Sequence, residues 1–519
     1  MASDEPRRLY PGTHAAERPD EPAIVFAPTG AVTTWRELDE RSNRIAHLLH
    51  GIGLRRGDHV AVIAENHPTY FEIMWAALRS GLYYTPVSSL LTPAEAGEVL
   101  RASRASVVFA SASCADLAEA AVAQAPDVRH RFTFGGDGSG GWVPLERAVA
   151  ELPTTALAHE PEGAPLWFSS GTSGRPKAVV RPLPDAPGDP VAAHYAATFG
   201  LDADTVHLCL GPLHHAAPIG FSTAVLRMGG TVVLTDRFDP EPVLALIERY
   251  QVTFSHLVPT MFVRLLKLPI DVRNRYDLSS LRRVVHGAAP CPVEVKRRMI
   301  EWWGPVIDEY YGGTEGVGST TISAAEWLAH PGSVGRASRG IIHITDDDGL
   351  EVATGDEGLV YFENPTATTE YRDDPDQTAA ITHPKGWQTL GDVGYVDDDG
   401  YLYLTDRWTH KIVTGGINVF PREVEDILLE HPAVLDAAVI GIPHEEMGEE
   451  VRAVVQLVHP ADESPELAAA LVTHCRERLA KHKCPRAVDF DAALPRQDNG
   501  KLYKRLIRDR YWSGQDRKI

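Results

Sequence analysis

The sequence is poor in cysteine. Its 519 residues include five cysteines, and no two of them form a CxxC pair. They are Cys114, Cys209, Cys291, Cys475 and Cys484. Scattered cysteines favour neither a disulfide framework nor a zinc cluster, because both are built from several cysteines at characteristic spacings. We therefore expect a protein of the reducing cytoplasm.

Long apolar runs and an excess of positive charge are absent as well. No apolar run approaches the roughly 20 residues of a transmembrane helix, and residues 1–22 are polar and rich in proline. The chain has 50 lysines and arginines against 71 aspartates and glutamates, which gives a formal net charge of −21. This balance argues against nucleic acid or an anionic membrane as the main partner, but it allows a local anion site. We expect no integral membrane segment, no export and no nucleic-acid partner.

The length and the apolar patterns indicate a large α/β protein. At about 150 residues per domain, 519 residues suffice for about three units, or for one large and one small domain. From residue 23 onward, short apolar runs alternate with amphipathic stretches. They predict a strand at 60–64, a helix at 74–82, and a helix that begins at Pro93 with Thr92 as its cap. Such alternation is typical of α/β layers.

The stretch from Leu166 to Lys177, LWFSSGTSGRPK, has the composition of a phosphate-binding loop. Its apolar start predicts a short buried strand, and hydroxyl side chains and glycines then crowd together before the lysine. Hydroxyls donate hydrogen bonds to phosphate, glycines let backbone amides approach an anion, and lysine supplies a compact positive charge. The candidate phosphate ligands are Ser169, Ser170, Gly171, Thr172, Ser173, Gly174 and Lys177.

Two other interpretations of this stretch are less favoured. A Walker loop ends in Gly-Lys-Ser/Thr and opens a helix, whereas here Pro176 precedes the lysine, which predicts a loop that caps no helix. A flexible Ser/Gly surface linker has a similar composition. A second apolar run, Ala178 to Val180, follows the loop, so the segment lies between two apolar runs and differs from a free linker.

The stretch resembles the phosphate-binding signature of the adenylate-forming superfamily, which includes acyl-CoA synthetases, coumarate:CoA ligases, luciferases and the adenylation domains of peptide synthetases. Three later motifs match this superfamily in the same order: GAAP at 287–290, YGGTEG at 311–316 and PRxxxGKxxKR at 495–505. The resemblance covers essentially the whole chain and is closest to fatty-acyl-CoA synthetase-like members. It implies an α/β fold with a large N-terminal adenylating domain of several subdomains and a small, mobile α+β C-terminal domain.

The resemblance also implies domain boundaries. Residues 1–405 would bind ATP and the acid, residues 406–409 would form a hinge that includes Thr409, and residues 410–519 would form the mobile domain. The apolar patterns of this last part predict the order strand, helix, strand, strand, helix. The first of these helices has Pro421 in its first turn and an apolar stripe of Val424, Ile427 and Leu428.

Residues for the nucleotide follow from the later motifs. Small residues after the strand near residue 285 would let backbone lie flat against a planar base, and an aspartate between glycines is a natural acceptor for two ribose hydroxyls. An arginine can hydrogen-bond the same sugar. By resemblance, the tyrosine of YGGTEG lies against adenine. The candidates are Gly287, Ala288, Ala289, Tyr311, Asp392 and Arg407.

Further residues are implied for the chemistry. By resemblance, Thr314 contacts the reacting phosphate, Glu315 binds magnesium, and Lys501 reaches the acyl carboxylate and the α-phosphate. A lysine in a surface turn is ordinarily solvated and inert, and we keep that interpretation for Lys504. His214 and His215 follow a short apolar run, where we expect a turn into a helix. By resemblance, His215 matches a histidine that lines the acyl channel of coumarate-type ligases, although a lone buried histidine is usually structural.

The implied reaction is ATP-dependent adenylation of a carboxylic acid with release of pyrophosphate, followed by transfer of the acyl group to CoA. ATP, Mg²⁺ and CoA would be the cofactors and a small-molecule acid the partner, in an enzyme that is a monomer or a homodimer. Gly415 and Gly416 match the small-residue face of the superfamily's CoA tunnel.

One alternative to CoA transfer stays open, and an inactive protein is disfavoured. The hinge carries Thr409 where aspartate or lysine is usual, with His410 and Lys411 after it, and related enzymes include ATP-dependent diazotases that activate nitrite for an aryl amine. A nucleotide-binding scaffold without activity is disfavoured, because all the residues that the chemistry needs are present together: Lys177, Glu315, Asp392, Arg407 and Lys501.

Overall fold

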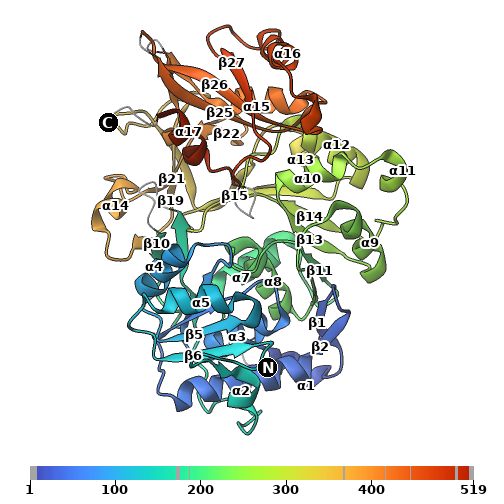
Figure 1. Ribbon diagram of the computed structural model, residues 1–519, viewed down its shortest axis with the longest axis vertical. Helices are drawn as coiled ribbons and strands as arrows, with labels where there is room; N and C mark the ends of the chain where they lie inside the picture. Colours follow the sequence, from blue (N-terminus) through green and yellow to red (C-terminus); the bar gives the residue numbers. More distant parts are fainter. Residues whose placement is uncertain are drawn as a thin grey trace. The chain divides into compact units, whose positions relative to one another are not determined.

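The computed structural model describes residues 9–170, 176–185, 188–365, 369–414, 417–444, 446–496 and 501–512. Figure 1 shows helices and strands alternating along most of the chain. The chain forms two compact units. Unit 1 comprises Met1–Leu257, Leu268–Val285 and Thr368–Thr378, and unit 2 comprises Val258–Lys267, His286–Ala367 and Ala379–Ile519. The hinge predicted at 406–409 lies inside unit 2 and stays a prediction.

Unit 1 contains a parallel sheet of six strands in the order β7-β6-β5-β3-β4-β8. Two of its inner strands contain continuous apolar runs, at residues 60–63 and 107–110, as expected where a parallel sheet is buried on both faces. The strands are β3 (His59–Ile63), β4 (Tyr83–Val87), β5 (Val107–Ser111), β6 (His130–Phe134), β7 (Val143–Pro144) and β8 (Ala164–Pro165). The helices between them are α3 (Pro68–Arg79), α4 (Pro93–Ser103), α5 (Ala115–Val122) and α6 (Leu145–Val149).

A second set of strands in unit 1 follows the order β14-β13-β11-β12-β1-β2 in one mixed sheet. Strand β2 pairs antiparallel with β1, and β1, β12, β11 and β13 pair in parallel. The strands are β1 (Pro22–Phe26), β2 (Ala31–Thr34), β11 (Val206–Cys209), β12 (Thr231–Leu234), β13 (Phe254–Leu257) and β14 (Arg283–His286). The other helices of unit 1 are α1 (Pro11–Glu17), α2 (Trp35–Gly51), α7 (Pro190–Phe199), α8 (Ala216–Met228), α9 (Pro240–Tyr250) and α11 (Ile270–Arg273).

The helix starts show which local signals the sequence carries clearly. Helix α4 begins at Pro93, and Thr92 and Glu95 form a capping box, which confirms the predicted start. The helix predicted at 74–82 is wrong at both ends, since α3 runs from Pro68 to Arg79. The His67 side chain accepts a hydrogen bond from the backbone N–H of Thr69 and so caps this helix. Histidine is outside the usual set of capping residues, so the apolar run alone suggested a start that was too late.

The glycine-rich loop connects two strands. Strand β9 (Trp167–Ser170) pairs antiparallel with β10 (Pro176–Val180), and Lys177 lies opposite Ser169. Strand β20 (Glu370–Tyr371) completes this small sheet on the other side of β10. The prediction that the loop caps no helix is therefore confirmed.

Unit 2 begins with an antiparallel ladder and a small sheet. Strands β15 (Ile307–Gly312), β16 (Ser319–Ile322) and β17 (Arg336–Arg339) form the ladder. A four-stranded antiparallel sheet follows, made of β18 (Ile341–Thr345), β19 (Gly358–Glu363), β21 (Gln388–Val396) and β22 (Leu402–Arg407). The helices are α10 (Pro259–Leu266), α12 (Val293–Trp303) and α13 (Ala324–Ala329). Helix α14 (Pro375–Ala380) spans the boundary between the two units.

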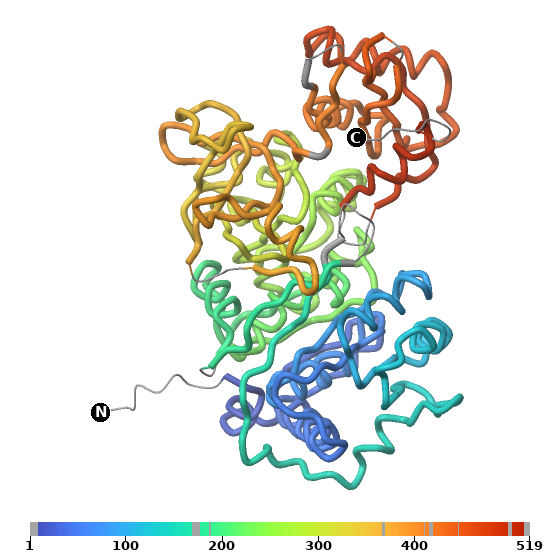
Figure 2. Tube along the Cα trace, turned by 90° about the vertical axis from the view of Figure 1, so that its left-hand side faces the viewer, coloured from blue at the N-terminus to red at the C-terminus, as the bar shows by residue number. Residues whose placement is uncertain are grey.

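The last part of unit 2 contains the predicted order of strand, helix, strand, strand and helix, coloured orange to red in Figure 2. Three strands and helices are added to this order. The first predicted strand is a pair of antiparallel strands, β23 and β24, and the end carries a strand β27 that pairs in parallel with β26 and a final helix α17. The elements are η2 (Trp408–His410), β23 (Ile412–Thr414), β24 (Ile417–Val419), α15 (Pro421–Glu430), β25 (Val434–His444), β26 (Gly448–Leu457), α16 (Pro465–Arg476), β27 (Ala487–Phe490) and α17 (Lys504–Trp512).

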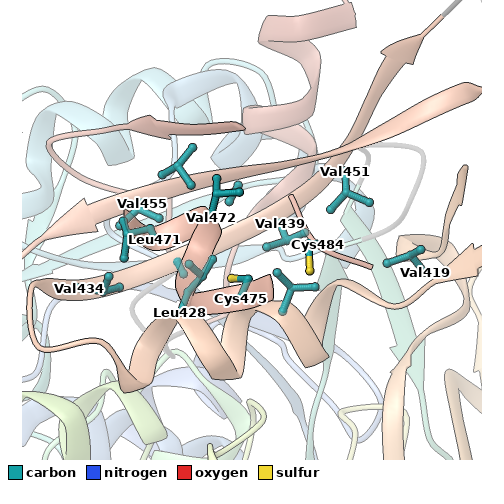
Figure 3. Close-up of a cluster of buried hydrophobic side chains, with 14 of the residues drawn as sticks. Val419, Leu428, Val434, Val439, Val451, Val455, Leu471, Val472, Cys475 and Cys484 are labelled. Carbon is teal, nitrogen blue, oxygen red and sulfur yellow. The ribbon is translucent and has the colours of Figure 1, made fainter. Parts of the chain in front are cut away.

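Side chains from these elements meet in a core of their own, shown in Figure 3. Helix α15 contributes Val424 and Leu428, the apolar stripe expected from the sequence, and α16 contributes Leu471 and Cys475. All four side chains are fully buried. This core keeps α15 and the strand β25 in fixed positions relative to each other.

Within the described ranges of the chain, no helix combines the length and the apolar character that crossing a membrane requires.

Candidate active site

The centre of the site in unit 2 is the carboxylate of Asp392. It lies on β21 opposite Arg407 of β22, and its two oxygens have different partners. The Tyr311 hydroxyl donates to Oδ2 at 2.7 Å, and the Arg407 Nε lies 3.1 Å from Oδ1. Two donors therefore hold the plane of the carboxylate, while the remaining lone pairs can accept from a bound ligand.

Charge and burial keep this group in a defined protonation state. Burial and then the charge of Asp392 raise the pKa of Tyr311 well above its ordinary value, so its hydroxyl stays a neutral donor. The charge of Asp392 raises the pKa of Arg407 in turn. The predicted ribose acceptor, its arginine and the predicted adenine-side tyrosine are thus brought together.

Backbone close to this group is held in an unusual conformation. Ala288 has a φ of 66°, the left-handed region that a residue with a side chain rarely adopts. The preceding Gly287 has the ring of Tyr310 so close that an added Cβ would lie 2.5 Å from it. Such a backbone conformation costs on the order of 1–3 kcal/mol. It persists only where the surrounding structure fixes it, which is often at a ligand site. The segment follows β14 directly, as predicted for an adenine-side turn.

The turn after β15 presents Thr314 and Glu315. Gly316 donates its N–H to the Gly313 carbonyl at 2.9 Å, which closes the turn. The Glu315 Oε2 lies 3.0 Å from where a Cβ on Gly313 would be, so the carboxylate folds back over the glycine. Carboxylate and hydroxyl oxygens side by side form the kind of donor set that Mg²⁺ prefers.

Lys501 lies within the electrostatic reach of this group. It is half-buried, and burial and then the charge of Arg407 lower its pKa to about 8, while Glu315 and Asp392 act in the opposite direction. The alternative of a fully solvated surface lysine is therefore wrong for this residue. The structure brings Lys501, Glu315, Asp392 and Arg407 into one charged cluster.

Lys177 belongs to unit 1 and has partners of its own there. Its Nζ hydrogen-bonds to the side-chain oxygen of Gln377 and lies 5.5 Å from the centre of the Tyr371 ring. Neither partner belongs to a motif. Because both lie far from Lys177 in the sequence, no local pattern predicts these two contacts. The superfamily usually has glycine at position 178, and here the Ala178 methyl packs into a small buried cluster with Tyr83 and Leu166.

His214 and His215 directly precede helix α8. His215 is the residue before the first helical position, as the sequence predicted for a turn into a helix. The ring centres of His214 and His215 lie 4.3 Å apart. In the second turn of α8, Phe221 stacks on Tyr195 of α7 with ring centres 4.4 Å apart. Aromatic packing thus fixes the start of α8, and with it the position of His215.

Several predicted residues lie outside the described parts of the chain. These are Gly171, Thr172, Ser173, Gly174, Gly415 and Gly416. The backbones of Ser169, Ser170 and Thr409 are described, in β9 and in η2, but nothing is stated of their side chains.

The sequence matches known protein families and characterised enzymes. Residues 12–372 match the family described as AMP-binding enzyme, and residues 423–501 match the AMP-binding enzyme C-terminal domain. The chain is 33% identical over 486 residues to a feruloyl-CoA synthase of Amycolatopsis sp, covering 93% of this chain and 94% of the relative. It is 29% identical over 498 residues to the long-chain-fatty-acid–CoA ligase FadD13 of Mycobacterium tuberculosis, covering 94% and 95%.

The fold agrees with these matches. The structure resembles the ATP-bound MatB of Rhodopseudomonas palustris with a TM-score of 0.83 and 27% identity, over 98% of this chain and 99% of that one. Fold and charged cluster together define an enzyme that forms adenylates from ATP. The chain belongs to the AMP-binding enzyme family.

Proposed function

We propose that this enzyme joins a carboxylic acid to coenzyme A in two steps driven by ATP. The observation that carries the proposal is the cluster of Lys501 with Glu315, Asp392 and Arg407, since it gathers the residues expected to act on one nucleotide. The named CoA ligases among its relatives favour CoA as the acceptor over the nitrite chemistry of a diazotase. Their names also suggest aryl acids and fatty acids as the first substrates to test.

ATP would be held on both sides of its sugar. The free lone pairs of Asp392 accept the two ribose hydroxyls, because Tyr311 and Arg407 already hold the carboxylate in place. The strained backbone from Gly287 to Ala289 and the Tyr311 ring lie on the adenine side. Lys177 and the hydroxyl-rich loop before it bind the triphosphate.

Glu315 and Thr314 fit a magnesium ion. Mg²⁺ is commonly held by one or two carboxylates together with the phosphates of the substrate, and Glu315 offers such a carboxylate. When bound, the ion supplies positive charge against the triphosphate. The protein's own part is to hold the Glu315 carboxylate over Gly313, ready for that ion.

In the first step, a carboxylate oxygen of the acid attacks the α-phosphorus of ATP. The bond from this phosphorus to the β-bridging oxygen breaks, and pyrophosphate leaves with the electron pair. Lys501, as an ammonium group, stabilises the negative charge that grows around the α-phosphate. His215 would face the acid beside the nucleotide.

In the second step, the CoA sulfur attacks the acyl carbon, the thiol proton is lost, and AMP leaves. We infer that the domain 410–519 rotates about residues 406–409 between the steps, withdrawing Lys501 and bringing Gly415 and Gly416 to the thiol channel. The cytoplasm is the expected compartment, and the enzyme acts as a monomer or a homodimer.

The test is pyrophosphate release across a panel of aryl and fatty acids, with nitrite as a further candidate, each with and without CoA. Mass spectrometry of the products should find a CoA thioester with a well-accepted acid. Acid-dependent pyrophosphate release that yields only adenylate in the presence of CoA, together with a diazonium product from nitrite and an aryl amine, would contradict the ligase proposal.

A further inference from the structure

Two cations flank Lys501, and each is bound to a carboxylate of a different element. The Arg496 guanidinium contacts both oxygens of Asp436 on β25, at 2.5 and 2.6 Å. The Lys504 Nζ lies 2.7 Å from the Glu425 Oε1 on α15. The segment with the catalytic lysine is thus tied to both a strand and a helix of the same core.

The two attachments are more buried than an ordinary surface ion pair. The side chains of Lys504 and Glu425 are 11% and 14% exposed. A second pair on the same helix, Lys483 with Glu423, has the same 2.7 Å separation but is 34% and 44% exposed. Exposed pairs usually stabilise little, whereas a charge left alone in a buried pair is strongly unfavourable.

Backbone contacts close the segment between these attachments. Arg496 and Leu502 form an antiparallel bridge, and Tyr503 donates its N–H to the Pro495 carbonyl at 2.8 Å. Lys501 is the residue next to that bridge, so its backbone position depends on where the bridge is held. Arg496 holds one side of the bridge, and Lys504 holds the start of α17 on the other.

Lys504 also acts on the predicted hinge. Against the effect of burial, hydrogen bonding from His410 and the charge of Lys504 lower the pKa of Asp406 to about 2. Asp406 in turn accepts the backbone N–H of Arg407 at 2.6 Å and that of Arg422 at 3.0 Å. The charge of the lysine that pairs with Glu425 therefore also acts on the residue that begins the predicted hinge.

We propose that Lys504 and Arg496 are positioning residues, which hold Lys501 in the orientation in which it faces Glu315 and Asp392. This inference rests on the proposed function. Neither residue is expected to touch the acid or ATP. Their role is specific to adenylation, because the second step proceeds with Lys501 withdrawn. Sequence patterns alone assign Lys504 no role.

The test compares Lys504→Met with Lys483→Met in the full-length enzyme. Methionine keeps the apolar stem and removes the charge, and both lysines pair with α15. ATP–pyrophosphate exchange with a well-accepted acid reports on adenylation, and thioester formation from the preformed acyl adenylate reports on the second step. We expect Lys504→Met to lose about 10²-fold in adenylation, because a displacement of a catalytic group by about 1 Å can cost that much. The second step should be kept. Lys483→Met should keep both, and Lys504→Arg should restore most of the adenylation.

Four results would overturn the inference. Adenylation by Lys504→Met equal to that of Lys483→Met would remove the positioning role, and an equal loss of both half-reactions would make the pair merely structural. If Lys504→Met fails to fold, the same comparison is made with Arg496→Lys. This variant keeps the positive charge and loses the bidentate contact with Asp436. Full adenylation by Arg496→Lys would then contradict the inference. A wild-type enzyme that releases no pyrophosphate with any acid would overturn the proposed function itself, and this inference with it.

Discussion

At the scale of single residues, the charge of Lys501 controls the proposed first step. A lysine is a cation below its pKa and neutral above it. Because burial and Arg407 lower this pKa to about 8, the group is charged at neutral pH but close to its titration. The nearby carboxylates of Glu315 and Asp392 favour the charged form that adenylation needs.

Adenylation should therefore weaken as the pH rises through about 8, since the ammonium group loses its proton there. Single-turnover pyrophosphate release, measured at pH values on both sides of that point, gives the profile. The Lys501→Arg variant keeps its charge over the whole range, so its alkaline fall should vanish whatever its absolute rate. A wild-type rate that stays level or rises through pH 8 would exclude this role for the lysine.

Tyr311 provides a second test at this scale. Its hydroxyl donates to the Asp392 carboxylate at 2.7 Å, and a hydrogen bond to a charged group contributes roughly 1.5 kcal/mol or more. Tyr311→Phe leaves one oxygen of Asp392 without this donor, so it should weaken ATP binding by about tenfold and lower the free energy of unfolding by about 1.5 kcal/mol. Isothermal titration with ATP checks this, with Tyr395→Phe on β21 as the control. Unchanged affinity in Tyr311→Phe would mean that Asp392 needs no such donor.

At the scale of elements, local signals predicted well and pairings between distant segments did not. The cap at Thr92, the turn before α8 and the apolar stripe of α15 each depend on neighbours in sequence, and the structure contains them. The start of α3 was missed because its cap is a histidine. The contacts of Lys177 with Gln377 and of Lys504 with Glu425 join residues far apart in the chain, so no local pattern in the sequence predicts them.

A buried ion pair anchors helix α8 of unit 1. Arg227 near its end lies 2.6 Å from Glu162, and the two side chains are 4% and 2% exposed. The Tyr10 hydroxyl and the Gly188 N–H also donate to Glu162. The pair therefore connects α8 to the chain segment before α1, through Tyr10, and to the segment between β10 and α7, through Gly188.

Removing one partner of such a pair leaves a buried charge alone, so Arg227→Met should lower the free energy of unfolding by about 3–5 kcal/mol. Urea unfolding of the full-length protein measures the loss. The control is Arg275→Met, because Arg275 pairs with Glu241 at 2.7 Å but both side chains are largely exposed. It should lose about 1 kcal/mol at most. Equal losses in the two variants would refute the structural role assigned to the Arg227–Glu162 pair.

At the scale of the whole molecule, the account needs two orientations of the C-terminal domain. Thr409 lies in η2, the short turn between β22 and β23, where a backbone rotation would swing the elements that follow. Proline fixes φ near −65° and so limits that rotation. Thr409→Pro should keep acid-dependent pyrophosphate release and lose thioester formation. Measuring both half-reactions separately checks this, and a parallel loss of both would remove the rotation from the account.

The most direct test of the central claim is Lys501→Ala, measured for ATP binding and for both half-reactions. The lysine is proposed to act on charge that develops in the transition state, so the ATP dissociation constant should stay close to that of the wild type while adenylation is lost. Thioester formation from added acyl adenylate should continue at the wild-type rate. An ATP affinity that weakens in step with the adenylation rate, or a preformed adenylate that is also turned over slowly, would contradict the account.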